Sequence, residues 1–235
     1  MLPISTHTTS CQGCAAKKAG WFCDLSPQHK AEFNALGRHI TFPAGDILFV
    51  EGQTARSISV VCEGRIKLTK TSRGGRTLLV KIATDGDVLG LSAALANSVY
   101  EVTAQATERT QIRSLQQKAF LEFMRRHAEV GLRAAESLSN DYLSVLSDAG
   151  RLALPGSNAG RLAHLLLELA VDSEDGLKTQ PDFHMSFRHD ELASMLGCSR
   201  ESITRVMSDF RRKGIIMVKG TRMTMLRREA LERLL

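Results

Sequence analysis

The sequence predicts an α+β protein with a β-rich first half, a long central helix and a helical C-terminal part that ends in a hairpin. Three observations predict this order: glycine-bounded β-rich runs between about residues 40 and 114, a helical stretch after them, and two short helical patterns around Gly197. The expected parts are a Cys-bearing lead segment at 1–26, a β-barrel domain at 27–116, a long helix at 117–150 and a C-terminal domain at 151–235.

Composition and charge distribution limit the function classes. The chain has 235 residues and is 43% hydrophobic, so it can bury a core without disulfides. It has no apolar run of the ~18 residues that a membrane span needs, and Met1–Ser10 does not resemble a signal peptide, so we expect a cytoplasmic protein. Residues 200–235 hold ten Lys or Arg and four Asp or Glu, which equals the net charge of +6 of the whole chain. Such a basic segment is typical of a protein that binds a phosphate backbone, although a basic solvated helix face would give the same count.

The β-rich part is predicted from strand periodicity and turn signals. Before it, Ser26 and Pro27 open a short helix that ends near Leu36. The apolar side chains that share one parity, as a half-buried strand requires, are Ile58, Val60, Cys62, Ile66 and Leu68. Because turn signals recur about every eight to twelve residues, we expect an antiparallel barrel or sandwich.

The helical stretch 117–150 carries apolar residues on more than one side. We expect one long helix with a bend near Gly131. Leu138 and Leu143 are placed on a seam between two copies of the chain, because a second apolar face needs a partner. The alternative is a helix that packs only on its own β-barrel.

Two helices around a glycine turn are predicted in the C-terminal part. A helix at Asn158–Val171 and a polar loop at Asp172–Asp182 come first. Arg188–Leu196 then forms a short helix that Gly197 ends, since a tight turn between helices favours positive φ. Ser199 is a favourable cap for the next helix. The apolar face of that helix, which must contact a core, consists of Ile203, Val206, Met207 and Phe210.

The opposite face of this helix carries groups that can read DNA bases. Arg200 and Thr204, like Glu201 and Arg205, are four residues apart and form one compact patch. Arginine can bond the two major-groove acceptors of guanine, and glutamate can accept from cytosine. A basic hairpin at 215–226 then forms a wing; the alternative is a small α/β module with a charged surface. The predicted DNA-binding residues are Ser199, Arg200, Glu201, Thr204, Arg205, Arg211, Arg212, Lys219 and Arg222.

The chain resembles the CRP/FNR family of bacterial transcription regulators over nearly its whole length. The strongest match is Leu196–Val206, and the turn segments 42–46, 62–67 and 85–90 are weaker matches. The resemblance implies an N-terminal β jelly-roll barrel of the cyclic-nucleotide-binding type, a dimerisation helix and a C-terminal winged helix-turn-helix. It also implies a homodimer without enzymatic activity, whose partners are double-stranded DNA and RNA polymerase. Because its Arg-Glu-x-x-x-Arg pattern is CRP-like, we expect an inverted repeat of TGTGA-like half-sites.

The effector is expected not to be a cyclic nucleotide. Relatives that bind one carry a Gly-Glu step that holds the ribose and an Arg-Ser or Arg-Thr pair that holds the phosphate. This chain resembles them at Gly90-Leu91-Ser92 and Tyr100-Glu101, where both the glutamate and the arginine are missing. A cyclic phosphate would lose its cationic partner and lie near a like charge.

The cysteines of the lead segment resemble those of the FNR branch, which hold an oxygen-sensitive [4Fe–4S] cluster with a fourth cysteine. The resemblance therefore implies a sensor of oxygen or redox state built from Cys11, Cys14 and Cys23. The gap between Cys14 and Cys23 is longer than in that branch, and Arg113 stands near the place of the fourth cysteine. Cys62 is the candidate for the fourth ligand.

Other interpretations of these features stay open. Asp141 could serve as a carboxylate ligand instead of Cys62, and the three lead cysteines could bind zinc or act as redox thiols. A regulator of the same fold could be gated by a small organic ligand in the β-barrel. A weaker alternative is a redox enzyme that uses Cys11 and Cys14 as a dithiol.

Overall fold

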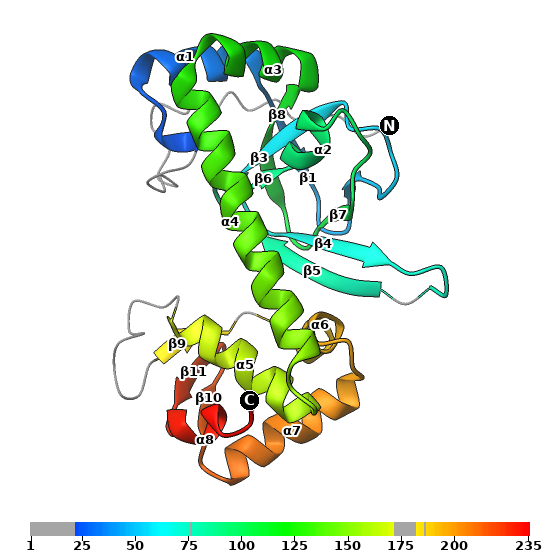
Figure 1. Cartoon of the computed structure of the whole chain (residues 1–235), viewed down its shortest axis with the longest axis vertical. Helices are drawn as coiled ribbons and strands as arrows, with labels where there is room; N and C mark the ends of the chain where they lie inside the picture. Colours follow the sequence, from blue (N-terminus) through cyan, green and yellow to red (C-terminus); the bar gives the residue numbers. More distant parts are fainter. Residues whose placement is uncertain (1–21, 76, 172–181, 186) are drawn as a thin grey trace. The chain divides into compact units, whose positions relative to one another are not determined.

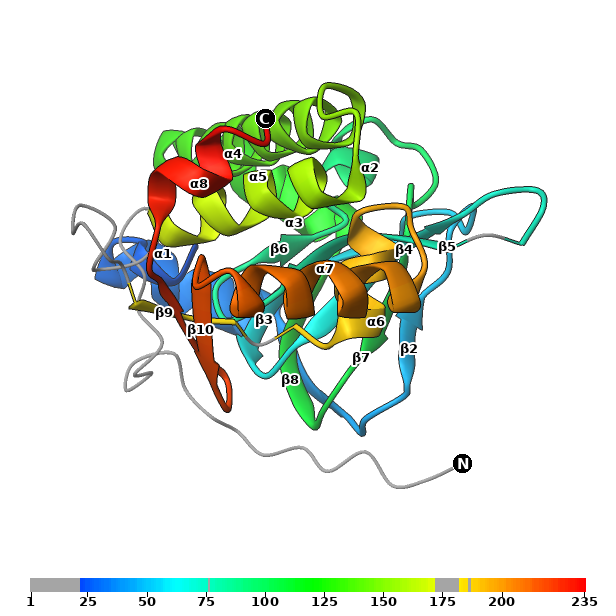
Figure 2. The same cartoon turned by 90° about the horizontal axis from the view of Figure 1, so that it is seen from below.

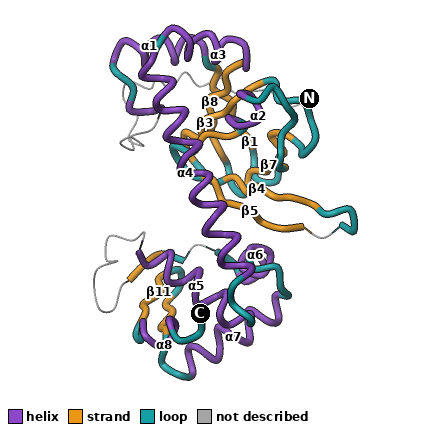
Figure 3. The backbone as a smooth tube through the Cα atoms, viewed as in Figure 1, coloured by secondary structure: helices purple, strands orange, loops and turns teal. Residues whose placement is uncertain are grey.

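The computed structural model describes residues 22–75, 77–171, 182–185 and 187–235 (Figure 1). Its backbone falls into two compact units, Met1–Leu143 and Ser144–Leu235. Strands occur in both units, and helix α4 (Ala128–Ala153) contains the boundary between them (Figure 3). None of the described helices is both long and apolar enough to cross a membrane.

Two four-stranded antiparallel sheets form the β-rich part of the first unit, in the orders β1-β8-β3-β6 and β2-β7-β4-β5. Their strands are β1 (Arg38–Phe42), β2 (Ile47–Phe49), β3 (Ser57–Glu63), β4 (Ile66–Thr71), β5 (Thr77–Ala83), β6 (Val88–Leu89), β7 (Thr103–Ala106) and β8 (Thr110–Gln116). Among the described residues no strand pairing joins the two sheets, so the predicted jelly-roll barrel is not closed. The edge strands β2 and β6 have only three and two residues.

Strand β3 is buried on both faces, which corrects the expectation of one half-buried parity. The other helices of this unit are η2 (Phe22–Asp24), α1 (Pro27–Leu36), α2 (Leu91–Leu95) and α3 (Gln117–Arg126). Ile58 packs on the helix side of its sheet, in a core cluster with Phe120 of α3. Val61 packs in a second core cluster, with Ile66 of the other sheet. Ile58 and Ile66 therefore lie on different sides, because the helices cover a sheet face that an alternating pattern would leave to water.

The predicted long helix is interrupted at His127 and not at Gly131. The backbone of His127 is extended, with φ −131° and ψ 105°, so α3 ends there and α4 begins at Ala128. Phe120 and Phe123 are completely buried against the first unit's core. This packing sets the direction of α3, and the extended residue lets α4 leave in a different one.

In the second unit the described residues form the end of α4, four further helices and a three-stranded sheet in the order β10-β11-β9. Its elements are α5 (Asn158–Val171), β9 (Asp182–His184), α6 (His189–Met195), α7 (Arg200–Arg212), β10 (Ile216–Lys219), β11 (Arg222–Met225) and α8 (Arg228–Glu232). The predictions of α5, of the helix pair and of the hairpin are confirmed. Strand β9 was not predicted, because its three residues are recognisable only by their pairing with β11. Most of the predicted polar loop lies outside the described residues.

Arg113 joins α1 to the sheet from a buried position. Its side chain is on β8, the residue is only 3% exposed, and Nη1 donates to the backbone oxygen of Asn34 at 2.9 Å. A second, longer bond of 3.4 Å reaches the oxygen of Gly37, and Nη2 contacts the ring of His39. A Cβ on Gly37 would come within 2.6 Å of Arg113 Cγ, so this approach requires a glycine.

Replacing Arg113 with Gln should lower the free energy of unfolding by about 2–4 kcal/mol, because buried carbonyl groups then lose a charged donor. Urea denaturation followed by circular dichroism measures this change. Arg109, four residues earlier in the chain, is exposed, and its replacement with Gln should cost less than about 0.5 kcal/mol. Equal losses in the two variants would contradict the role assigned to Arg113.

Candidate nucleic-acid interface

Helices α6 and α7 form a helix-turn-helix around Gly197 (Figure 2). Gly197 has φ +62°, which confirms that the turn needs a glycine-like backbone. Cys198 follows it, and its N–H donates to the oxygen of Ala193 at 3.0 Å. Ser199 caps α7, since its hydroxyl accepts from the backbone N–H of Ser202 at 3.2 Å. Burial raises the pKa of the Cys198 thiol, so this thiol stays protonated at neutral pH.

The rotation of α7 about its axis is set by its apolar side chains. Ile203, Met207 and Phe210 are 0–3% exposed, and Val206 beside them is half-buried. The opposite face is therefore directed to solvent. The predicted base-reading side chains Arg200, Glu201, Thr204 and Arg205 are all exposed on it.

The patch holds positively charged hydrogen-bond donors and one negatively charged acceptor. The backbone N–H of Glu201 and the Ser199 hydroxyl hold the pKa of the Glu201 carboxyl below its usual value, so it is ionised at neutral pH and can accept a hydrogen bond. In the described part of the chain, the guanidinium groups of Arg200 and Arg205 donate no hydrogen bond to another residue, although the charge of Arg200 also helps to keep Glu201 ionised. The Thr204 hydroxyl differs from them, because it already donates to the oxygen of Arg200 at 2.9 Å.

The other predicted DNA contacts are not equivalent. Arg212 donates to Asp209 at 2.6 Å, and Lys213 lies 2.8 Å from the same carboxylate. These two cations hold the pKa of Asp209 below its usual value. Arg211 has no such partner among the described residues, which leaves its charge available. Lys219 and Arg222 are exposed and pair across the wing turn at the ends of β10 and β11.

An aromatic stack includes Tyr100, one of the two residues at which the family resemblance places the phosphate-binding pair. Tyr100 is 4% exposed, and its ring lies on Phe49 with centroids 3.9 Å apart. The Tyr100 hydroxyl donates to the oxygen of Ser57 at 2.8 Å. Glu101 accepts a hydrogen bond of 2.9 Å from the hydroxyl of Ser92. Sequence reasoning missed this stack, because Phe49 and Tyr100 are far apart in the chain.

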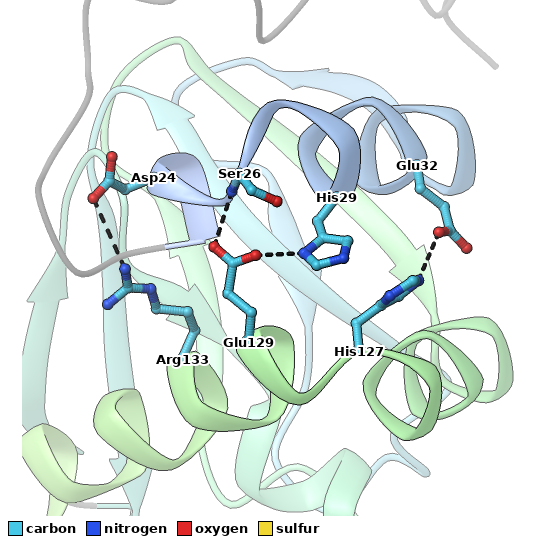
Figure 4. Close-up of polar contacts among 7 residues, drawn as sticks. All are labelled: Asp24, Ser26, His29, Glu32, His127, Glu129 and Arg133. Atoms are coloured by element: carbon cyan, nitrogen blue, oxygen red, sulfur yellow. Dashed lines mark hydrogen bonds and ion pairs between the residues drawn. The ribbon is translucent and has the colours of Figure 1, made fainter.

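Polar contacts join the lead segment to the first turns of α4 (Figure 4). The N–H of Ser26 donates to Glu129 Oε1 at 2.9 Å, and His29 Nδ1 contacts the other oxygen of Glu129. The bond from His29 and that from Ser26 hold the pKa of the Glu129 carboxyl below its usual value, although burial opposes them. One turn further along α4, Arg133 lies 3.9 Å from Asp24.

A second polar contact lies beside the first. His127, at the break between α3 and α4, contacts Glu32 of α1 at 2.7 Å, and Arg126 contacts the same carboxylate at 2.5 Å. The rings of His127 and His29 are 4.3 Å apart. None of these residues was singled out from the sequence, because no local motif signals a contact between segments about 100 residues apart.

The predicted metal ligands are only partly within the described residues, since Cys11 and Cys14 lie outside them. Cys23 is in η2 and packs against the core cluster of the helices. Cys62 is half-buried on β3, with Sγ 3.8 Å from the oxygen of Val60. The described residues contain no group of three or more His, Cys, Asp or Glu side chains that could hold a metal ion. A cluster site would therefore depend on Cys11 and Cys14.

Asp141, considered as a carboxylate ligand, belongs to an ion-pair network. Lys81 of β5 lies 3.3 Å from Asp141 and 3.1 Å from Asp87. Burial acts to lower the pKa of Lys81, but the two carboxylates outweigh it and hold that pKa above its usual value. Asp141 thus binds α4 to the sheet of its own unit.

Comparison with protein families agrees with the division into two units. A Crp-like helix-turn-helix domain matches residues 160–234, and a cyclic nucleotide-binding domain matches residues 39–127. The first match contains the whole α6–α7 pair and the wing. The second contains α3 and, except for Arg38, the strands of both sheets of the first unit.

Individual relatives cover most of the chain. The transcriptional regulator LdrP of Thermus thermophilus is 27% identical over 192 residues, which are 82% of this chain and 94% of the relative. The CRP-like cAMP-activated global transcriptional regulator of Mycobacterium tuberculosis is 26% identical over 211 residues, which are 86% of this chain and 90% of the relative. The crystal structure of TTHB099, a CRP-family transcriptional regulator of Thermus thermophilus, superposes with a TM-score of 0.61 at 26% identity, over 82% of this chain and 94% of that one.

FixK2 from Bradyrhizobium japonicum, at 18% identity, has the same fold with a TM-score of 0.70 over 84% of this chain and 96% of that one. The relatives are transcriptional regulators and not enzymes, so the alternative of a dithiol redox enzyme finds no support. With its helix-turn-helix, its cyclic-nucleotide-binding-type domain and these relatives, the chain belongs to the CRP/FNR family of transcriptional regulators.

Proposed function

We propose that the protein is a homodimeric regulator in which two α7 helices read an inverted repeat of TGTGA-like half-sites, with RNA polymerase as its further partner. One observation carries the proposal of base reading. The face of α7 that is forced into solvent begins with Arg200, Glu201 and Arg205, the side-chain types that match guanine and cytosine in the major groove. Arg211 and the wing residues Lys219 and Arg222 supply positive charge for the phosphates beside it.

Replacing Arg200 with Val should weaken binding to the preferred sequence by about 1–3 kcal/mol per half-site and relax the choice at one base pair. The measurement is a selection from random duplexes with the wild type and the variant. The matched control is Arg211→Gln, which should weaken all sequences about equally and reduce the salt dependence. An unchanged consensus for Arg200→Val would contradict the proposed contact.

Dimerisation is proposed through one exposed stripe of α4. Residues three and four apart along the helix are exposed and mostly small or apolar, in the heptad spacing of a coiled-coil seam: Leu132, Ala135, Ser139, Tyr142, Leu146, Ala149 and Ala153. Leu143 is 58% exposed beside the stripe. Leu138 packs against the core of its own unit, so it is a poor probe of the seam.

Replacing Leu146 with Glu should weaken self-association by about two orders of magnitude, because each dimer would bury two unpaired charges. DNA affinity should fall with it. Sedimentation velocity and anisotropy on a labelled duplex measure the two effects. Ser144→Glu adds the same charge to an exposed position on the opposite face and should leave the dimer intact. A full dimer in Leu146→Glu would show that the seam lies elsewhere.

We also propose that the lead cysteines sense oxygen or redox state and that a cyclic nucleotide is not the effector. Cys23 is supported as a sensor position by its neighbours, since Asp24 and Ser26 contact Arg133 and Glu129 of α4. A change at Cys23 would thus act on the proposed dimer helix over a short path. A [4Fe–4S] cluster held with Cys11 and Cys14 would supply the oxygen-sensitive chemistry.

Protein purified without oxygen should contain iron and sulfide, and Cys23→Ser should lose most of both, because the cluster would lack a ligand. Elemental analysis measures this, and Cys198→Ser is the control that should keep its iron. Absence of iron from the anaerobic wild type would remove the cluster proposal. Heat of binding on titration with cyclic AMP would favour a nucleotide effector instead.

A further inference from the structure

A small groove lies beside the base-reading patch, between the start of α6, the middle of α7 and the turn of the wing. Its volume is about 250 Å³, and its lining includes Arg188, His189, Arg211, Gly220 and Thr221. Two arginines and a histidine therefore line one hollow together with the apolar residues Met185, Phe187, Met207 and Val218, whereas no Asp or Glu lines it. Such a surface suits an anion of the size of a phosphate group.

The hydrogen bonds of Thr204 determine which nitrogen of His189 carries a proton. Thr204 Oγ1 donates its single hydrogen to the oxygen of Arg200 at 2.9 Å. With that hydrogen on the oxygen of Arg200, the hydroxyl accepts from His189 Nδ1, which lies 3.0 Å away and is then the protonated nitrogen. In the neutral ring Nε2 is then an acceptor only. Within the described residues Nε2 has no hydrogen-bond partner.

We propose that His189 is a proton-linked contact to the DNA backbone, an inference that rests on the proposed role of α7 in reading DNA. A neutral His189 offers a lone pair to a phosphate oxygen and cannot bond it. The imidazolium donates from Nε2 and adds a positive charge to the groove. DNA binding thereby takes up one proton per protomer where the free ring is neutral.

The charged neighbours of His189 support the uptake of a proton when DNA binds. On α6, Arg188 lies 3.4 Å from Asp190, and Glu191 accepts from the backbone N–H of Arg188 at 2.8 Å, so both carboxylates already have partners. On α7, Arg200, Glu201 and Arg205 share the exposed patch with Thr204, and Arg211 lines the groove. No titratable side chain of the wing lines the groove. A phosphate bound at Nε2 would favour the imidazolium, because it places a negative charge beside the ring.

The sign of the pH dependence follows from this linkage. Since the bound state holds the extra proton, DNA affinity is greatest below the range in which imidazoles titrate and falls as the pH rises through it. For a dimer with two such contacts, binding should tighten about tenfold between about pH 8 and about pH 6. The salt dependence should also be steeper at the lower pH, by about 0.9 per protonated His189.

The test is anisotropy with the full chain and the duplex recovered in the selection, at constant ionic strength and at both pH values. His189→Gln should bind at either pH as the wild type binds near pH 8. His189→Arg should bind tightly at both. Thr204→Val should reduce the pH effect, because Nδ1 then no longer has to carry the proton and a neutral ring can donate from Nε2. His164→Gln, a histidine of the same unit paired with Glu168, is the control that should keep the wild-type pH effect.

A pH effect that survives in His189→Gln would overturn the assignment, as would a wild type whose affinity does not change with pH. Recovery of no preferred duplex by the wild type would remove the proposed function and this inference together. Sequence-selective binding without the His189 effect would remove this inference alone. The two failures are therefore distinguishable.

Discussion

The side chains of Ile203, Met207 and Phe210 are almost completely removed from water, and they all lie on one stripe of α7. Burial of a large apolar side chain stabilises a fold by about 1.5–3 kcal/mol, so three of them oppose any rotation of the helix about its axis. Capping by Ser199 and the positive φ of Gly197 fix where the helix begins. The base-reading patch and the groove at His189 both depend on that constraint, because they occupy the face that the core does not use.

The side chains of this exposed face differ in whether their hydrogen-bonding groups already have a partner in the protein. The guanidinium groups of Arg200 and Arg205 donate no hydrogen bond within the described residues, whereas the Thr204 hydroxyl donates to the backbone of its own helix. This distinction changes the expected role of Thr204, from a hydrogen-bonding reader of bases to a residue that sets the tautomer of His189. Arg211 and Arg212 are likewise adjacent and alike in sequence, but only Arg212 is engaged by Asp209.

In the first unit, an aromatic cluster organises the helices on one sheet. Phe22 contacts both Phe33 and Phe120, with ring centroids 5.9 and 5.7 Å away. The lead segment is thereby attached to the same core as α1 and α3. The polar contacts of Glu129 and Arg133 then connect it to α4, the helix with the exposed seam. The lead segment and α4 are therefore in direct contact through these residues.

Local pattern alone determined α1, α5, the α6–Gly197–α7 turn, the wing and the base-reading patch. These features depend on caps, glycine turns and helical periodicity, which act between residues near each other in the chain. The break at His127, strand β9, the open barrel and the second buried face of β3 were decided only by tertiary packing. The same holds for Arg113, the Tyr100–Phe49 stack and the His189–Thr204 bond. Each of them joins residues well separated in sequence, and their partners are selected by which surfaces meet when the chain folds.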